Sequence, residues 1–353
     1  MVAVIGTGNR EKALAEVIKK SPRVRFSYLL HWTSVDEVTT IIRDRRVDLV
    51  IIGPEAPLVA GLVDKLKRAG IPAVGPTAAA ARLEGSKFYG RVVAGEAGVP
   101  IPKYRVVHPG QDIERIVRDQ ELPVVVKRDG LADGKGVSTT TTAEKTLAKA
   151  REELLFGSIL LEERLVGREI SVFFACDGVN AVFIGAACDK KRLLDGDEGP
   201  NTGGMGAFSL ALQLSDDLLE QIKRRIAPLT LAVMRKRGCP YHGILYLGLM
   251  LVEVNGAIVP YLIEYNCRFG DPEAQVILPL MDCDIMDYLL GTLTEGGLED
   301  LPPMRFRPGA AICVSIADKE YPTKGHRLFS VVGTGATHAL AGQDAYEQIE
   351  RLK

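Results

Sequence analysis

The chain has 353 residues, of which 46% are hydrophobic and 25% are charged, values typical of a soluble protein with two or three domains. Its 44 basic and 45 acidic residues leave a net charge of −1, without the basic excess of nucleic-acid or membrane-surface proteins. Apolar runs fall short of the roughly 18 residues that span a bilayer, and the start shows no signal peptide. We therefore expect a cytoplasmic protein that binds neither nucleic acid nor membrane; the sequence does not indicate its oligomeric state.

Residues 1–100 alternate short apolar runs with segments of helical periodicity. Strands are expected at 2–6, 24–30, 47–53 and 71–76, and helices at 9–20, 34–46 and 56–70. The second helix begins at Ser34, with Glu37 three residues later, the pattern of a capping box. This alternation predicts βαβ units and a parallel sheet. Ligands of such sheets bind beyond the carboxyl ends of the strands, where 6–11 and 53–57 are expected.

The pattern changes after an extended, proline-containing linker at 98–104. Residues 101–188 predict an α+β lobe of short strands with helices near 111–120 and 143–155, and 189–297 predict a second lobe. That second lobe begins with the glycine-rich run "DEGPNTGGMGAFS" (197–209), interpreted as a loop, and continues with a helix at about 215–238. Two strands, 243–254 and 258–266, follow and are joined by Asn255-Gly256, a strong hairpin signal. Residues 298–353 predict a short C-terminal segment.

The run "VVVKRDGLADGKGVS" (124–138) is a strand, a glycine-punctuated loop and a second strand. Lys127 at the end of the first strand can place its ammonium on phosphates. Gly130, Gly134 and Gly136 allow backbone N–H groups to approach the same phosphates. The spacing and the missing helix exclude a P-loop. A flexible surface hairpin is the alternative.

A second candidate site lies in "YLIEYNCRFGDPEAQ" (261–275). Glu264 and Asn266 are two residues apart on a strand, so their side chains share one face. A carboxylate and an amide oxygen suit Mg²⁺, which takes oxygen ligands and leaves room for phosphates. Arg268 follows on that face and can grip a carboxylate or phosphoryl group with two N–H donors. Such a polar face is costly on an apolar strand unless it has ligands.

Glu162 and Glu169, in "LLEERLVGRE" (160–169), form a hinge-like acidic pair. In this order and spacing, the lysine with its glycine hairpin, the acidic hinge and the distal E-x-N strand resemble the ATP-grasp superfamily. Within it, "GPEAPLV" (53–59), "LEGSK" (83–87), "GPNTGGMGAFS" (199–209) and "RFGDPEAQ" (268–275) resemble the glycinamide ribonucleotide synthetase family, from residue 2 to about 295.

The resemblance implies an N-terminal parallel-sheet domain of the pre-ATP-grasp type, a two-lobed ATP-grasp domain and a reduced C-terminal segment. It also implies an ATP-dependent ligase that activates glycine as an acyl phosphate and joins it to phosphoribosylamine, with Mg²⁺ or Mn²⁺ as the metal. The residues that it places on ATP are Lys87, Lys127, Gly130, Gly134, Lys135, Gly136, Glu162, Leu165 and Glu169. Metal binding is assigned to Glu264 and Asn266, and catalysis to Arg268, Arg192 and Asp189. The residues assigned to the substrates are Gly6, Gly8, Arg10, Pro54, Glu55, Asn201, Thr202, Gly203, Gly204, Met205 and Gly206.

Several positions depart from the family pattern. The family usually has G-x-G-G-R-E-H at the first loop, whereas this chain has Asn9 and Lys12 at two of those positions, and a Pro-Gly-Asn loop near the ribose site is missing. The lid carries Arg128 and Asp133, and the C-terminal domain is shortened. These departures leave open a divergent ligase with another amine acceptor. A regulatory nucleotide-binding protein and a dinucleotide-dependent oxidoreductase are weaker alternatives, the latter resting on "GTGNRE" alone.

Overall fold

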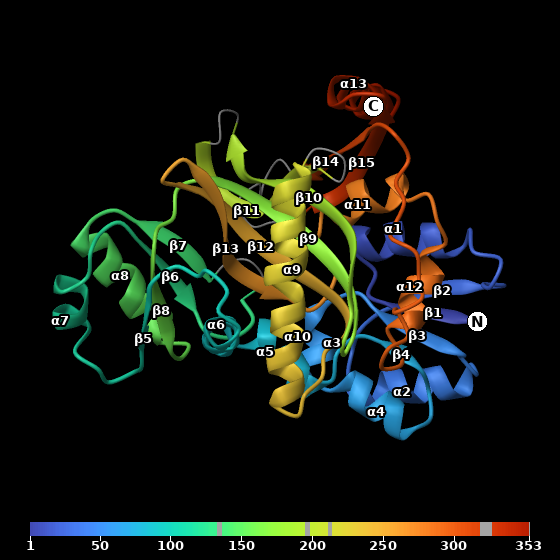
Figure 1. The fold of residues 1–353 in the computed structure, drawn as a ribbon, viewed down its shortest axis with the longest axis horizontal. Helices are drawn as coiled ribbons and strands as arrows, with labels where there is room; N and C mark the ends of the chain where they lie inside the picture. Colours follow the sequence, from blue (N-terminus) through green and yellow to red (C-terminus); the bar gives the residue numbers. More distant parts are fainter. Residues whose placement is uncertain (133–135, 195–197, 211–213, 318–326, 353) are drawn as a thin grey trace.

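The computed structural model describes the chain except residues 133–135, 195–197, 211–213, 318–326 and 353. Of residues 192–194, 198–201 and 203, only the backbone is described. The described residues form three sheets: a parallel sheet near the N-terminus, a small antiparallel sheet, and a large antiparallel sheet between them (Figure 1). Among the described residues, no helix combines the length and apolarity needed to cross a membrane.

The N-terminal sheet has four parallel strands in the order β2-β1-β3-β4, as the alternating pattern predicts. The strands are β1 (Val2–Ile5), β2 (Ser27–Leu30), β3 (Leu49–Ile52) and β4 (Ala73–Val74). The accompanying helices are α1 (Asn9–Ile18), α2 (Val35–Asp44), α3 (Glu55–Val59), α4 (Leu62–Arg68), α5 (Ala78–Gly85) and α6 (Lys87–Glu96). Every residue of β1 and β3 is buried, which explains their continuous apolar runs.

In this region the predicted cap of one helix is confirmed, and the predicted extent of another helix is wrong. The Ser34 hydroxyl caps α2 by accepting a hydrogen bond from the Glu37 amide at 3.3 Å. The single helix expected over 56–70 is wrong: it is divided into α3 and α4 at Gly61, whose φ of +84° is left-handed. Such a φ interrupts a right-handed helix and is favourable for glycine.

The small sheet is antiparallel, with order β5-β8-β6-β7, and two helices cover it (Figure 1). Its elements are β5 (Tyr104–Val107), α7 (Ile113–Arg118), β6 (Val124–Arg128), β7 (Val137–Thr140), α8 (Ala143–Leu154) and β8 (Ile159–Glu163). Val107, Val126 and Leu161 are fully buried and lie in a hydrophobic cluster with residues of α7 and α8. This core is separate from the two larger clusters of the chain, so the lobe packs around its own interior.

The large sheet has seven strands in the order β13-β12-β9-β10-β11-β14-β15. The strands are β9 (Arg168–Asp177), β10 (Ala181–Leu194), β11 (Glu198–Ser209), β12 (His242–Val254), β13 (Ala257–Asn266), β14 (Ala310–Ala317) and β15 (Arg327–Gly335). The helices are α9 (Asp216–Arg225), α10 (Ala227–Lys236), α11 (Ala274–Ile277), α12 (Ile285–Gly291) and α13 (His338–Glu350), with the 3₁₀ turn η2 (Leu278–Leu280) after α11. Asn255 and Gly256 both have positive φ, at 52° and 80°, as a tight turn between β12 and β13 requires.

Two predictions for this region are wrong in their details. The helix expected at 215–238 is two helices that meet at Ile226, where α10 begins with a proline in its first turn, a residue that has no N–H to continue the preceding helix. Residues 198–209 of the glycine-rich run, which we expected to form a loop, are strand β11. A Cβ at Gly204 would lie 2.7 Å from Pro272 Cδ, and one at Gly206 would lie 2.4 Å from the Cys313 carbonyl oxygen. These two glycines allow β11 to pack against its neighbours.

The sheets divide the chain differently from the predicted segments. Residue 188 lies inside β10, and β9 and β10 pair within the large sheet. The chain therefore passes from the small sheet to the large one between Glu163 and Arg168. The segment 298–353 adds β14 and β15 to the edge of the large sheet, with α13 packed on them.

Candidate active site

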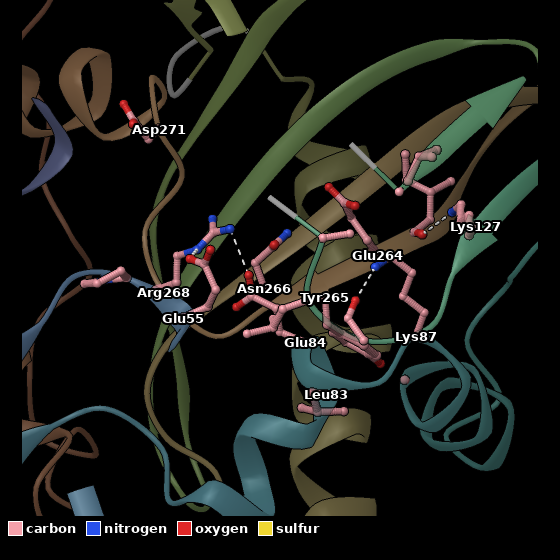
Figure 2. Close-up of a pocket in the computed structure, with 18 of the residues that line it drawn as sticks. Glu55, Leu83, Glu84, Lys87, Lys127, Glu264, Tyr265, Asn266, Arg268 and Asp271 are labelled. Carbon is pink, nitrogen blue, oxygen red and sulfur yellow. Dashed lines mark hydrogen bonds and ion pairs between the residues drawn. The ribbon is translucent and has the colours of Figure 1, made fainter. Parts of the chain in front are cut away.

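A cavity of about 380 Å³ lies where the three sheets meet. Its walls come from the starts of α1 and α3, from α5 and α6, from β6 with its glycine loop and the start of β7, from β13 with the segment after it, and from β15. Figure 2 shows Lys127 near one end and Asp271 at the other, with Glu264, Asn266 and Arg268 between them. The sequence-predicted residues in its lining are Arg10, Pro54, Glu55, Lys87, Lys127, Gly130, Gly136, Glu264, Asn266 and Arg268.

A bulge in β13 shapes the middle of the cavity. Gly248 of β12 is opposite Glu264, but the next residue, Leu249, is opposite Leu262, so Ile263 is the extra residue. Bulges leave one residue unpaired and re-aim its neighbours. The Ile263 carbonyl accepts hydrogen bonds from Lys127 at 2.9 Å and from Arg91 at 2.6 Å. A Cβ at Gly248 would lie 2.7 Å from Glu264 Cγ, so this glycine makes room for the Glu264 side chain.

Glu264 and Asn266 bring two kinds of oxygen donor to this cavity. Burial raises the pKa of Glu264, but the positive charges of Lys191, Lys127 and Lys87 outweigh it, and the net pKa lies below the ordinary value. The carboxylate is therefore ionised at neutral pH. Among the described residues, the side-chain nitrogen of Asn266 is buried without a hydrogen-bond partner, so this NH₂ group is available to donate to a ligand oxygen, such as that of a phosphate. The ionised carboxylate of Glu264 and the side-chain oxygen of Asn266 are the donors that suit Mg²⁺, which prefers oxygen ligands and shares them with phosphates.

Lys127 is held in place by a buried ion-pair cluster. Its ammonium lies 2.7 Å from one carboxylate oxygen of Glu162. Arg91 of α6 grips both oxygens of that carboxylate, at 2.7 and 2.9 Å. Burial raises the pKa of Glu162, yet Lys127 and Arg91 outweigh it and lower the pKa. The resemblance places Glu162 on ATP, but in the structure both of its carboxylate oxygens are engaged by cations.

The glycine loop after β6 is joined to the start of α6. Lys87 donates to the Gly130 carbonyl at 2.9 Å, and Asp129 accepts from the Ser86 hydroxyl and the Phe88 amide. The pKa of Lys87 is lowered by burial, against the opposing effect of Glu264. The loop and Lys87 therefore lie on the same side of the cavity. Gly134 and Lys135 of this loop are outside the described residues.

Arg268 is the centre of a second charge cluster. Its guanidinium lies 2.9 Å from Glu55 and 2.8 Å from Glu84, and it donates to the Phe269 carbonyl at 3.2 Å. Burial lowers the pKa of Arg268, but both carboxylates outweigh it, so the net pKa rises and the charge is permanent. Figure 2 shows Arg268, Glu84 and Glu55 close together; they come from the segment after β13, from α5 and from the start of α3.

The first glycine loop is filled by its own helix. The Glu11 carboxylate accepts from the Gly8 amide at 2.9 Å, and a Cβ at Gly6, Gly8 or Gly53 would lie within 2.8 Å of a Glu11 side-chain atom. A dinucleotide fold would place pyrophosphate on those amides. The negative charge that fills this space rules against the oxidoreductase interpretation. Arg10 lies beside it, 2.6 Å from Glu11 and 3.1 Å from the Phe269 carbonyl oxygen.

Three predicted residues, Asp189, Leu165 and Glu169, lie outside the lining of this cavity. Asp189 is 3.9 Å from Lys191, which also pairs with Glu169. Burial, with the negative charges of Glu273 and Glu169, raises the pKa of Asp189 to about 7 against the opposing charge of Lys191. Leu165 is half-buried in the connection from β8 to β9. Glu169 therefore has a lysine partner, and a contact with ribose remains a prediction.

The glycine-rich motif has structural partners of its own. The Thr202 hydroxyl donates to the Lys191 carbonyl at 2.9 Å and accepts from the Gly204 amide at 3.1 Å. Gly206 is paired with both β10 and β14, and Met205 is half-buried. The resemblance assigns Gly206 to the substrates, but the backbone of this residue is paired within the sheet. The side chains of Arg192 and Asn201 and the surroundings of Gly203 are outside the described residues.

Comparison with known proteins places the chain in one family. Residues 1–84 match the N domain of phosphoribosylglycinamide synthetase, and residues 85–274 match its ATP-grasp (A) domain. The chain belongs to the phosphoribosylglycinamide synthetase family.

Relatives of this phosphoribosylglycinamide synthetase family member are similar to it over most of their length. A phosphoribosylamine–glycine ligase of Rhizobium meliloti is 38% identical over 91% of this chain and 79% of its own. The crystal structure of the Thermotoga maritima phosphoribosylamine–glycine ligase has a TM-score of 0.84 at 28% identity, covering 99% of this chain and 96% of that one. The biotin carboxylase domain of a Hydrogenobacter thermophilus 2-oxoglutarate carboxylase, solved with MgADP, shares the fold, with a TM-score of 0.65 at 15% identity over 92% of this chain and 76% of its own.

Three residues of this phosphoribosylglycinamide synthetase family member are missing from the sequence-based site. Glu84 directly precedes the Gly-Ser-Lys of 85–87 and is buried. An acidic residue in an otherwise mostly apolar helix is the sequence signal that could have identified it. Arg91 lies one helical turn after Lys87, but a single arginine in a helix is ordinary. Arg327, which lines the cavity and lies 2.6 Å from Asp271, had no sequence signal.

Proposed function

We propose that this chain joins glycine to phosphoribosylamine at the expense of ATP, forming glycinamide ribonucleotide, ADP and phosphate in purine biosynthesis. The observation that carries the proposal is one cavity lined by two lysines, an oxygen-donor pair and a clamped arginine, in a chain of this family. The same conclusion is supported by relatives that bear the name phosphoribosylamine–glycine ligase at 38% identity.

Lys87 and Lys127 bind the ATP phosphates in this proposal, and the loop around Gly130 and Gly136 covers them. Glu162 and the Ile263 carbonyl hold the Lys127 ammonium, so it is positioned before ATP arrives. Positioned cations stabilise phosphoryl transfer without a reorganisation cost during the reaction. Leu165 and Glu169 are proposed to contact the adenosine part.

Glu264 and Asn266 would hold Mg²⁺ between these lysines and Arg268. When bound, the metal supplies positive charge to the transferring phosphoryl group. The two residues leave most of the coordination shell for water and phosphate, as is usual for this ion. Among the described residues, no group of three or more histidine, cysteine or acidic residues offers a competing metal site.

Arg268 and Asp189 are proposed to position glycine. A glycine carboxylate oxygen attacks the terminal phosphorus of ATP, and ADP leaves. The amine of phosphoribosylamine then attacks the acyl carbon, loses a proton and displaces phosphate. No side-chain nucleophile is needed, because orientation and charge stabilisation lower both barriers.

The test is phosphate release from ATP in the presence of glycine, with and without freshly generated phosphoribosylamine. We expect release only with both substrates and a product with the mass of glycinamide ribonucleotide. Release that needs glycine but ignores phosphoribosylamine would replace the proposed acceptor with another amine. Release without glycine would contradict ligase activity altogether.

A further inference from the structure

The part of the cavity where we propose that phosphoribosylamine binds, the acceptor side, needs a cation for the phosphate of that substrate. The first glycine loop does not provide one. The Gly8 amide is already bonded to Glu11, and the Glu11 side chain occupies the space above Gly6, Gly8 and Gly53. An incoming phosphate would meet this carboxylate at close range, and like charges repel strongly away from water. The phosphate must therefore bind elsewhere in the cavity.

Three arginines line this side of the cavity among the residues that the structure describes: Arg10, Arg268 and Arg327. Arg268 is neutralised by two carboxylates, Glu55 and Glu84. Arg10 is neutralised by the buried Glu11. Within the described part of the chain, Arg327 has one carboxylate partner, Asp271, at 2.6 Å. The Arg327 side chain is 18% exposed, against 16% for Arg268 and 9% for Arg10. Arg327 is thus the most exposed of these three arginines and is paired with a partly exposed carboxylate.

Arg327 is held by Asp271, and the strand that carries it is held by the first glycine loop. Its guanidinium donates to the Asp271 carbonyl at 3.1 Å and to the Asp271 carboxylate at 2.6 Å. Farther along β15, the Ser330 hydroxyl accepts from the Asn9 side chain at 3.2 Å. Strand β15 thereby lies against the first glycine loop as well as the loop after β13. The C-terminal segment is a wall of the cavity.

We propose that Arg327 binds the phosphate group of the amine acceptor, so that the C-terminal segment sets specificity for a phosphorylated amine. This inference rests on the proposed function for the identity of the acceptor. The bonds to Asp271 fix the plane of the guanidinium and leave further N–H groups of the fork for phosphate oxygens. Arginine suits this role because its planar fork matches the geometry of a phosphate.

The first experiment compares wild type with Arg327→Gln and Arg327→Lys in steady-state kinetics. We expect the KM for phosphoribosylamine to rise about 10- to 100-fold in Arg327→Gln, which is the range for losing a charge-assisted hydrogen bond. The KM values for ATP and glycine stay within about twofold, and Arg327→Lys lies between the other two enzymes. Arg305→Gln, at an exposed arginine of the same C-terminal segment, is the matched control and behaves as wild type.

The second experiment measures equilibrium binding of ribose 5-phosphate and of ribose, and needs no turnover. We expect wild type to prefer ribose 5-phosphate and Arg327→Gln to lose that preference. Equal binding of both sugars by wild type, or an unchanged preference in Arg327→Gln, would overturn the proposal. A selective rise in the glycine KM would also overturn it and would assign Arg327 to the glycine carboxylate. Wild type that binds ribose 5-phosphate through Arg327 but ignores phosphoribosylamine would contradict the proposed function and not this site.

Discussion

The two ends of the cavity are built in different ways. At the end where we propose that ATP binds, the nucleotide end, Lys127, Glu162 and Arg91 form one connected ion-pair cluster that positions a lysine. At the end where we propose that phosphoribosylamine binds, the acceptor end, Arg10, Arg268 and Arg327 each have their own carboxylate partners. The first end combines charges to position one group, whereas the second distributes neutralised arginines around an opening. Under the proposed function, nucleotide binding is therefore set by one cluster and acceptor binding by several separate ion pairs.

The largest effect is expected at Arg268, between the two ends. In Arg268→Lys a point charge replaces a fork that contacts Glu55 and Glu84 together, and kcat should fall about 10²- to 10³-fold, as when a preorganised donor is lost. Phosphate release measures kcat, and thermal unfolding checks that the variant folds. Arg82→Lys, at an exposed arginine of α5, is the control. Near-normal kcat in Arg268→Lys would remove Arg268 from the catalytic group.

A change at Glu264 should be felt through the metal. In Glu264→Gln we expect the Mg²⁺ concentration for half-maximal activity to rise roughly 10- to 100-fold. Substitutions of residues that support a metal site commonly lower the metal affinity by that factor. A magnesium titration at saturating ATP and glycine measures it. Glu253→Gln lies on the exposed end of β12 and serves as control. An unchanged titration in Glu264→Gln would contradict the metal assignment.

Arg91 distinguishes the nucleotide end from the acceptor end. Arg91→Met removes the fork from Glu162, so Lys127 loses its alignment and the KM for ATP should rise about tenfold. The KM for phosphoribosylamine should stay unchanged, and Arg91→Lys should restore part of the loss. A lower unfolding temperature with an unaltered ratio of the two KM values would show that Arg91 is structural only.

Asp177, outside both ends, provides a baseline for stability. Its carboxylate accepts from the amides of Val179, Asn180 and Leu298. Burial raises the pKa of Asp177, but these amides outweigh it and hold the pKa below the ordinary value. Asp177→Asn should lower the free energy of unfolding by about 1–3 kcal/mol at pH 7.

The pH dependence of this difference follows from the direction of the shift. A carboxyl with a lowered pKa in the folded state stabilises the protein above its unfolded pKa of about 3.9. That stabilisation is lost as the pH falls through the folded pKa, so the two proteins should converge in acid. Urea unfolding at pH 7 and below pH 4 measures both values. A difference that stays constant with pH would show that the ionised carboxylate is not responsible.

The nucleotide end could be predicted from the sequence because its groups lie on short, patterned segments. Glu264 and Asn266 are two apart on one strand, and Lys127 ends an apolar run. The alternation of apolar runs and helices in the first hundred residues likewise predicts the parallel sheet. Local periodicity was enough for these features.

The remaining features depend on contacts between distant parts of the chain. Arg91 meets Glu162 across 71 residues, and Asn9 meets Ser330 across 321. The glycines of β11 are needed because of Pro272 and Cys313, which lie on other segments. The same glycines were assigned to the substrates because composition alone does not distinguish close packing from ligand binding.

The close approach at Gly206 has a mechanical consequence for substrate choice. The Cys313 carbonyl occupies the position where a side chain at 206 would begin, and Cys313 belongs to β14, the strand that holds β15 in register. A methyl group at 206 would press β14 outward, and β15 would be displaced with it. The displacement would reach Arg327, the first residue of β15, which lines the cavity. Gly206 thus sets the position of the strand that carries Arg327.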